Sequence, residues 1–277
     1  MKQRVLAIFG ASSLLVACVP PSPPALAYGL PSTTEVVYDF ADTTYVFVSV
    51  MGQSLEMSQA GVARYAIDFS PAPRGVSVSL SVEALAATIN QPMGAPLRID
   101  ENDVEGMLVF TLDRRGSSTV SREPEVQPQA SLMVSGMSIA HTFFPRLPGR
   151  AVVAGEEWVD TVSFEGREGA GGRRETSVLR YTVVGDTVVS GRPLLVISLR
   201  GTTQSANDMS VSGMTVSQSS ELEVQGRILW DYQRGMMVES VKRATGRGTA
   251  SVPIAPAPLP ITIESTQRAR LRERQPR

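Results

Sequence analysis

The sequence offers few side chains whose type and spacing could support chemistry, and its only histidine is the first of them. His141 lies in the stretch SIAHTFFP, beside two phenylalanines. A Ser-His-Asp triad could use its imidazole as a general base, but the sequence has no G-x-S-x-G nucleophile elbow. A metal site would need partners that a single histidine does not identify. We therefore expect a structural or surface role for His141.

Three carboxylates in GEEWVDTVSF, Glu156, Glu157 and Asp160, raise the question of glycoside hydrolysis, which uses two acids on either side of the scissile bond. Adjacent residues of a strand point to opposite faces of a sheet, so Glu156 and Glu157 are unable to flank one bond together. Trp158 is expected to pack in the core on one of those faces.

A second acidic cluster could offer oxygen ligands to calcium: Asp100, Glu101, Asn102, Asp103 and Glu105. The cluster lacks the spacing at positions one, three and five, with glycine at six, that an EF-hand loop requires. A solvated turn is the expected structure. Together these patterns predict no metal site, no cofactor and no enzymatic activity.

The only cysteine, Cys18, lies between an apolar run and a cluster of prolines. Lys2 and Arg4 precede the run, which extends from Val5 to Ala17 and has the length of a secretory signal rather than of a membrane span. An A-x-A site for an ordinary signal peptidase also occurs at residues 25–27. Cleavage there would release a protein without an anchor, but this site lies far beyond the apolar run.

Leu15-Val16-Ala17-Cys18 resembles the lipobox of bacterial lipoproteins. The resemblance implies that diacylglycerol is attached to the Cys18 sulfur and that the signal peptide, residues 1–17, is cut off between Ala17 and Cys18. Two or three acyl chains hold a protein on a membrane, whereas one chain binds only marginally. Val19 follows the cysteine where lipoproteins of the inner membrane commonly carry Asp, so the resemblance favours the outer membrane, with the protein facing the periplasm.

Residues 18–34 contain a proline cluster that favours an extended tether between the lipid and the folded body. The chain has 26 basic and 27 acidic residues, and removal of Lys2 and Arg4 with the signal leaves 24 − 27 = −3. This charge does not predict nucleic-acid binding. With Cys18 modified no thiol remains for disulfides, so the body must be stabilised by burial.

The body has the hydrophobic pattern of antiparallel strands. Apolar residues alternate with other residues in GVARYAIDF and GVSVSLSV, and the pattern recurs in TYVFVSV, TSVLRYTVV, PLLVISLR, VQGRILWDY and PITIEST. The segment SVEALAATIN, from Ser81, could form a short helix or extend a strand. Gly, Pro, Asn and Asp separate the strands, and DRRG at 113–116 fits a type I hairpin turn. The sequence predicts an all-β, antiparallel fold.

Two pairs of similar segments suggest an internal duplication. Arg64-Tyr65 corresponds to Arg180-Tyr181, and DVEGMLVFTLDRRG from Asp103 corresponds to EVQGRILWDYQRG from Glu223. We therefore predict a first β half at 35–122, a linker with a turn at 123–150 and a second β half at 151–277. The halves could form one curved sheet, as in an open barrel, or two packed β units.

Two further resemblances bear on the function. FFPRLPGRAVVAGEEW resembles a pattern in uncharacterised secreted bacterial β proteins, and a strongly curved antiparallel sheet resembles the envelope carriers of lipids and lipoproteins. The carriers imply a non-catalytic binding module for an apolar or amphiphilic ligand. The alternative is a structural or assembly lipoprotein that binds another envelope protein. An internal cavity lined by Met, Val and Leu favours binding, and a solid core favours scaffolding.

The segment ITIESTQRARLRER near the C-terminus places arginines at alternate positions: Arg268, Arg270, Arg272 and Arg274. As a strand it would carry these guanidinium groups on one face, where they could bind phosphates of lipid headgroups. The favoured interpretation is that charged residues on an edge strand prevent edge-to-edge aggregation. The eleven methionines are likewise expected mainly to fill core volume rather than to line a ligand pocket.

Overall fold

A computed structural model describes residues 25–50, 52–92, 94–168, 171–211, 214–253, 255 and 257–272. The chain forms one large antiparallel sheet of twelve strands, two small two-stranded sheets and one short α-helix. The predicted all-β antiparallel class is therefore confirmed. Among the described residues, no helix is long and apolar enough to cross a membrane.

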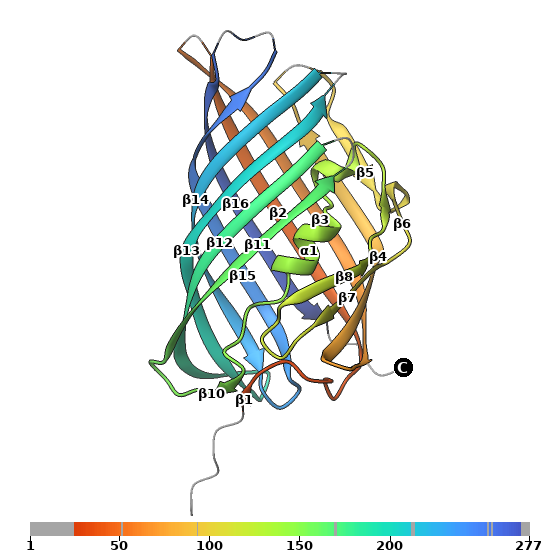
Figure 1. Cartoon of the computed structure of the whole chain (residues 1–277), viewed down its shortest axis with the longest axis vertical. Helices are drawn as coiled ribbons and strands as arrows, with labels where there is room; N and C mark the ends of the chain where they lie inside the picture. Colours follow the sequence, from red (N-terminus) through yellow and green to blue (C-terminus); the bar gives the residue numbers. More distant parts are fainter. Residues whose placement is uncertain are drawn as a thin grey trace, which may run out of the picture.

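The large sheet wraps around one long axis to form an open barrel (Figure 1). Its strands follow one another in the order β11 (Glu157–Glu168), β12 (Gly171–Val189), β13 (Arg192–Val211), β14 (Met214–Asp231), β15 (Met236–Ser251), β16 (Leu259–Arg272), β2 (Glu35–Val50), β3 (Gln53–Ala72), β4 (Gly75–Asn90), β7 (Leu108–Leu112) and β8 (Ser118–Arg122). Strand β5 (Leu97–Asp100) pairs with the upper part of β4. The small sheets join β1 (Ala25–Leu26) to β10 (Arg150–Ala151), and β6 (Val104–Glu105) to β9 (Glu125–Val126).

The two halves suggested by the sequence share this sheet, because β16 pairs with β2 along twelve residue pairs. Arg64-Tyr65 and Arg180-Tyr181 lie on β3 and β12, with both tyrosines buried. The duplication itself stays a prediction. SVEALAATIN is a strand, the continuation of β4, and not a helix.

The sheet is not closed, because its end strands β8 and β11 do not pair with each other in the described chain. Helix α1 (Gly136–Thr142) lies in the gap between these strands (Figure 1). The 3₁₀ helices η1 (Glu101–Asp103) and η2 (Ala130–Leu132) are also in the connections. The predicted turn at 113–116 is present, since the Gly116 N–H donates to the Asp113 carbonyl at 3.0 Å and Gly116 adopts a φ of 85°.

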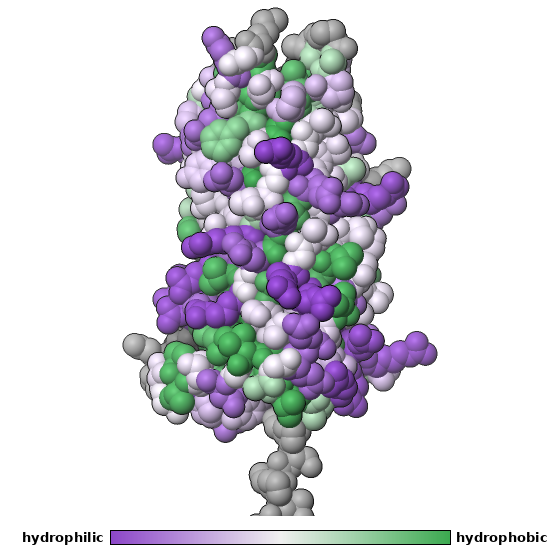
Figure 2. Space-filling view, turned by 90° about the vertical axis from the view of Figure 1, so that its left-hand side faces the viewer, coloured by the Kyte–Doolittle hydropathy of each residue, from purple (hydrophilic) through white to green (hydrophobic). Residues whose placement is uncertain are grey.

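Inward side chains at the lower half of the barrel form the core. Its largest fully buried members include Trp230, Tyr38, Phe110 and Ile67, and Trp158 is buried as predicted. The outer face carries ion pairs across neighbouring strands, such as Arg180–Glu157 and Arg174–Glu165. Charged side chains are spread over the face drawn in Figure 2, between smaller apolar patches.

Strands β12 to β15 bend closely around the axis because glycine occupies inward positions there. A Cβ added at Gly201 would lie 2.0 Å from the Val178 carbonyl oxygen, and one at Gly248 would lie 2.0 Å from that of Ser219. Larger residues would force neighbouring strands apart, so these glycines permit the curvature of the barrel wall.

Candidate functional site

The interior has two levels along the barrel axis. The lower level, near β1 and β10, is apolar and aromatic, with Tyr38, Phe69, Phe110 and Trp230 among its buried residues. Above it, the inner face of the same strands carries polar and charged side chains, among them Asp42, Glu175, Ser177 and Lys242, which we call the upper or polar level. Farther along β16, Ile261 and Ile263 are again buried. An interior of this kind can receive a molecule with one apolar and one polar part.

A segment outside the large sheet fills the lower level. This plug segment, residues 130–147, contains η2, α1 and the two phenylalanines that follow α1. The Phe144 ring makes an edge contact with Tyr38 at a centroid distance of 6.5 Å and lies 6.2 Å from Phe110. Phe143 contacts Tyr38 and Tyr65 at 5.4 and 5.9 Å. The plug segment therefore supplies the aromatic centre of the core.

Local sequence signals explain why the plug segment forms this helix. The Ser135 hydroxyl accepts a hydrogen bond from the Ser138 N–H at 3.0 Å and so caps the first turn. Pro145 follows the helix and lacks an N–H, so it does not continue the helical hydrogen bonding. Its carbonyl accepts a hydrogen bond from the Tyr28 hydroxyl at 2.8 Å.

Two methionines of the plug segment pack on glycines of the sheet. A Cβ at Gly61 of β3 would lie 2.8 Å from the Met133 Cε, and a Cβ at Gly166 of β11 would lie 2.9 Å from the Met137 Cγ. Met236 and Met237 are buried in the core, which fits the expected use of methionine as filling volume. Met51 lies outside the described residues, and the side chain of Met214 is not described.

His141 joins the plug segment to both edges of the sheet. Its ring stacks on Phe164 of β11 at a centroid distance of 5.1 Å, and its Nδ1 lies 2.6 Å from the Ser118 hydroxyl of β8. Burial, and then the positive charge of Arg146, lower the pKa of His141. The contacts on both edges support the structural role expected for this residue.

Lys242, on strand β15 of the barrel wall, forms a hydrogen bond with the C-terminal end of α1. Its Nζ donates to the Thr142 carbonyl at 2.6 Å, and burial lowers its pKa to about 8. The sequence analysis did not identify this residue. A signal was available, because only Lys2 and Lys242 are lysines among 26 basic residues. A lone lysine among arginines points to a position that requires a compact ammonium group.

A row of polar side chains extends from Lys242 along the inner wall. Lys242 pairs in register with Gln267 of β16, which pairs with Asp42 of β2. Burial raises the pKa of Asp42, whose Oδ1 has no hydrogen-bond partner in the described chain, while its Oδ2 lies 3.4 Å from the Gln59 amide nitrogen. Asp42 is 9% exposed, so this carboxyl group is nearly buried.

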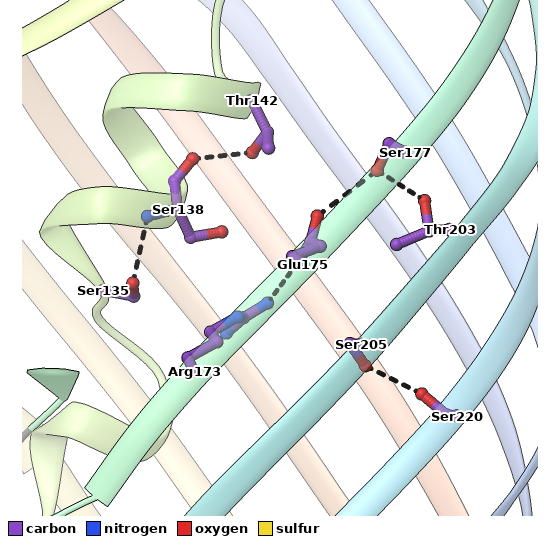
Figure 3. A network of polar contacts seen from close by, with 9 residues as sticks. All are labelled: Ser135, Ser138, Thr142, Arg173, Glu175, Ser177, Thr203, Ser205 and Ser220. Atoms are coloured by element: carbon purple, nitrogen blue, oxygen red, sulfur yellow. Dashed lines mark hydrogen bonds and ion pairs between the residues drawn. The ribbon is translucent and has the colours of Figure 1, made fainter. Parts of the chain in front are cut away.

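The wall formed by β12 to β14 carries a second set of polar contacts near α1 (Figure 3). Glu175, which is 7% exposed, accepts from Arg173 at 2.7 Å and lies 3.4 Å from the Ser177 hydroxyl. Ser177 also contacts Thr203 at 2.8 Å. A further pair, Ser205 and Ser220, bridges β13 and β14 at 2.8 Å. The polar level thus has its own hydrogen bonds.

The docked plug segment also contains a buried cation that has no carboxylate partner in the described chain. Arg146 is 6% exposed, and its Nε and Nη1 have no hydrogen-bond partner in the described chain. Burying charged donors without partners costs free energy. Docking of the plug segment therefore carries a penalty at Arg146, in addition to the desolvation of Lys242.

Two hollows of about 470 Å³ each are present on the surface of the described chain. One lies beside α1 at the gap between the sheet edges, and its lining includes Ser118, Val120, Met137 and His141. Most of its lining residues are polar, unlike those of the internal Met, Val and Leu cavity that would favour binding. The lower interior next to it is filled by the plug segment.

The predicted arginine stripe lies on the outer face of β16. The favoured interpretation of an edge strand was wrong, because β16 pairs with β15 on one side and with β2 on the other. Arg268 pairs with Glu239 at 2.9 Å, and Arg272 lies 3.8 Å from Asp39. The second hollow is on this face, where Arg268 and Arg270 border it. Arg274 lies outside the described residues, as do Ala17 and Cys18.

The other acidic candidates have local partners. Glu157 points outward and accepts from Arg180 and Thr182, which together lower its pKa. Asp100 caps η1 in a reciprocal arrangement with Asp103. No group of three or more potential metal ligands occurs in the described chain.

No family model matches the chain, and no curated protein matches it. Solved structures similar to it include the β domain of the Bordetella autotransporter BrkA, with a TM-score of 0.29 and 9% identity over 87% of this chain and 100% of that chain. A BenF-like porin from Pseudomonas fluorescens Pf-5 has a TM-score of 0.25 and 7% identity over 88% and 100%. OccK2 (OpdF) of Pseudomonas aeruginosa, in complex with glucuronate, has a TM-score of 0.22 and 8% identity over 86% and 98%.

Proposed function

We propose that this chain is a non-catalytic binding module for an amphiphilic ligand and that its own plug segment occupies the ligand position in the structure. The observation that carries the proposal is the origin of Phe143 and Phe144. These rings fill the apolar interior, but they belong to a segment inserted between the sheet edges rather than to the barrel wall.

The plug segment is held by contacts that a ligand could replace. Phe143 and Phe144 provide apolar area that an acyl chain would also bury. Displacement would return Arg146 to water and would free Lys242 from the Thr142 carbonyl. The hollow beside α1 gives a route of entry at the gap.

The polar level favours an anionic head on this ligand. Lys242, Arg173 and Arg146 supply positive charge, against Glu175 and Asp42, and burial favours the neutral form of Asp42. An anionic head beside Lys242 would favour its charged form and oppose the lowering of its pKa. The ligand class that fits both levels is therefore a long apolar chain with a carboxylate or a similar head.

The protein is further proposed to be a lipoprotein of the cell envelope, anchored through Cys18 to the outer membrane and facing the periplasm. The lipobox supports this placement. Charged residues and ion pairs on the outer face are compatible with a body surrounded by water.

Binding is tested with the mature chain, residues 18–277, carrying Cys18→Ser and titrated with a fluorescent long-chain fatty acid. We expect binding together with faster hydrogen exchange of the α1 amides. Gly166→Ala, which crowds Met137, should tighten binding, and Lys242→Met should weaken it. Gly172→Ala is the matched control, because nothing lies within 4 Å of its added Cβ. Absence of binding in all variants, or binding that leaves α1 protected, contradicts the proposal.

The alternative, a structural or assembly lipoprotein that binds another envelope protein, is favoured by the two end strands. Strands β8 and β11 each pair on one side only in the described chain, so a partner strand could add to either edge. A photo-crosslinker at Ser163 of β11, compared with one at Ser198 in the middle of the sheet, tests this alternative in cells. One defined envelope protein crosslinked only from Ser163, with no fatty-acid binding in vitro, would favour assembly over ligand binding.

A further inference from the structure

The two ends of the barrel differ in the charge of their connections. At the lower end in Figure 1, each of four hairpin turns contains arginine or is followed directly by one. The arginines of these turns are Arg74, Arg114, Arg115, Arg192 and Arg234. At the other end, the segments 51–52, 91–96, 169–170, 212–213 and 252–258 connect strands and contain no charged residue. The positive charge of the turns is therefore confined to one end.

Three of these arginines are available to a partner. Arg74, Arg114 and Arg115 are exposed, and no ion pair involves them in the described chain. The acids in the same turns do not neutralise them. Asp113 accepts from the Arg115 and Ser117 N–H groups at 2.8 Å.

The other acid, Asp231, is 3% exposed and accepts from the Gln233 and Arg234 N–H groups at 3.0 Å. Its carboxylate therefore stabilises its own turn and leaves the arginines on the other turns unpaired.

The N-terminal chain leaves the body at this same end. Ala25 of β1 pairs with Ala151 of β10, and the Tyr28 N–H donates to the Arg114 carbonyl at 2.9 Å. Six residues, 19–24, separate Cys18 from β1. An extended proline-rich segment covers about 3 Å per residue, so these residues span about 20 Å at most. A lipid on Cys18 would therefore hold the arginine-rich end near the bilayer.

We infer that this end docks on the anionic headgroup surface of the membrane that carries the anchor, with Arg74, Arg114 and Arg115 contacting lipid phosphates. The inference rests on the proposed lipidation of Cys18. Guanidinium groups bind phosphate oxygens with paired hydrogen bonds, and arginines near an anionic leaflet add to membrane affinity. Docking in this orientation directs the end whose connecting segments lack charged residues, and the polar level of the interior, away from the bilayer.

The test measures binding of the mature chain, residues 18–277 with Cys18→Ser, to vesicles containing phosphatidylglycerol and to vesicles of phosphatidylcholine alone. Without the acyl anchor, the arginines account for the binding. The variant Arg74→Gln/Arg114→Gln/Arg115→Gln should bind anionic vesicles at least about tenfold more weakly. Binding of the unsubstituted chain should fall as salt is raised.

The matched control is Arg200→Gln/Arg243→Gln/Arg247→Gln, which removes the same charge from exposed arginines along β13 and β15. This control should bind like the unsubstituted chain. The inference is overturned if the turn variant binds anionic vesicles as strongly as the unsubstituted chain, or if the control loses as much binding as the turn variant. It is also overturned if the unsubstituted chain binds both vesicle types equally. The substituted turn side chains make no hydrogen bond in the described chain, so thermal unfolding of the turn variant should be unchanged.

The outcome is separable from that of the proposed function. Fatty-acid binding reports on the interior, and vesicle binding reports on the turns. Lipidation is checked independently, because Cys18→Ser in cells should abolish incorporation of labelled fatty acid into the protein and block precursor processing. If the Cys18→Ser variant is unchanged in both respects, the proposed orientation loses its basis, whatever the result with fatty acids.

Discussion

The lower and upper levels of the barrel interior are built by the same strands but from opposite kinds of side chain. On β12, Tyr181 and Val183 point into the aromatic level, whereas Glu175 and Ser177 point into the polar level. On β2, Tyr38 belongs to the first and Asp42 to the second. The difference indicates that the lower level supplies most of the stability, since buried apolar area dominates folding, and that the upper level supplies polar specificity.

Truncation of the plug segment should have the largest effect on stability. Phe144→Ala removes a ring that is 3% exposed and leaves a cavity among Tyr28, Tyr38 and Phe110. We expect the free energy of unfolding to fall by about 3–5 kcal/mol in urea denaturation. Val184→Ala on the outer face, at a side chain that is 60% exposed, should change it by less than about 0.5 kcal/mol. Similar losses in both variants would contradict the assignment of stability to the lower level.

Removal of a charge from the polar level should cost less. Glu175→Gln removes the ion pair that the nearly buried Glu175 makes with Arg173 at 2.7 Å, and we expect a loss of about 2 kcal/mol. The control is Glu165→Gln, because the Glu165 and Arg174 side chains are 70% and 67% exposed. A solvated pair of that kind should contribute less than about 1 kcal/mol. Equal unfolding midpoints for the two variants would show that the polar level resembles the outer surface.

The pH dependence of stability should report the desolvation of Lys242. Its pKa is about 8 when folded and near 10.5 when unfolded, so the unfolded chain binds more protons between these values. Stability should therefore rise with pH in this window, by about 2 kcal/mol relative to Lys242→Met. Urea denaturation of both proteins between pH 7.5 and 10 measures the difference. If the free energy of unfolding depended on pH in the same way for both proteins, Lys242 would be well solvated in the folded state.

The smallest effect is expected at the contact between the plug segment and the sheet edge. Gly166→Ala should lower stability by about 0.5–1 kcal/mol, because its Cβ would lie 2.9 Å from the Met137 Cγ, and α1 amides should exchange faster. Gly172→Ala on β12 should be neutral or slightly stabilising, since it meets open space. Unchanged exchange in α1 after Gly166→Ala would indicate that Met137 adapts without moving the helix.

The outer strand pattern and the turns were predictable because each depends on a few adjacent residues. Alternation in GVSVSLSV places Val78 inward and Ser79 outward, as observed. Helix α1 was not predicted, since seven residues are too few for a clear helical period. SVEALAATIN remained ambiguous because its small residues suit both structures, and pairing of β4 with β3 decided the strand.

The alternation of side chains along a sequence indicates a strand, but it does not always indicate which face of that strand is buried. On β12, Ser177 is 5% exposed and faces the interior, while the neighbouring Val178 is 44% exposed and faces outward. From the polarity of the side chains alone, Val178 would be expected inside and Ser177 outside. The register with β11 and β13 continues from the buried Tyr181, so the wrapping of the whole sheet determines which face is inside.

The sequence by itself determined the antiparallel β class, the burial of Trp158 and the turn at 113–116, because strand period and turn chemistry are local. Only the tertiary structure decided that one sheet wraps into an open barrel, that Phe143 and Phe144 fill it, and that Lys242 meets the end of α1. These features join residues that are far apart in the chain, such as Lys242 and Thr142. Their proximity depends on the register and curvature of many strands at once, which no short stretch of sequence specifies.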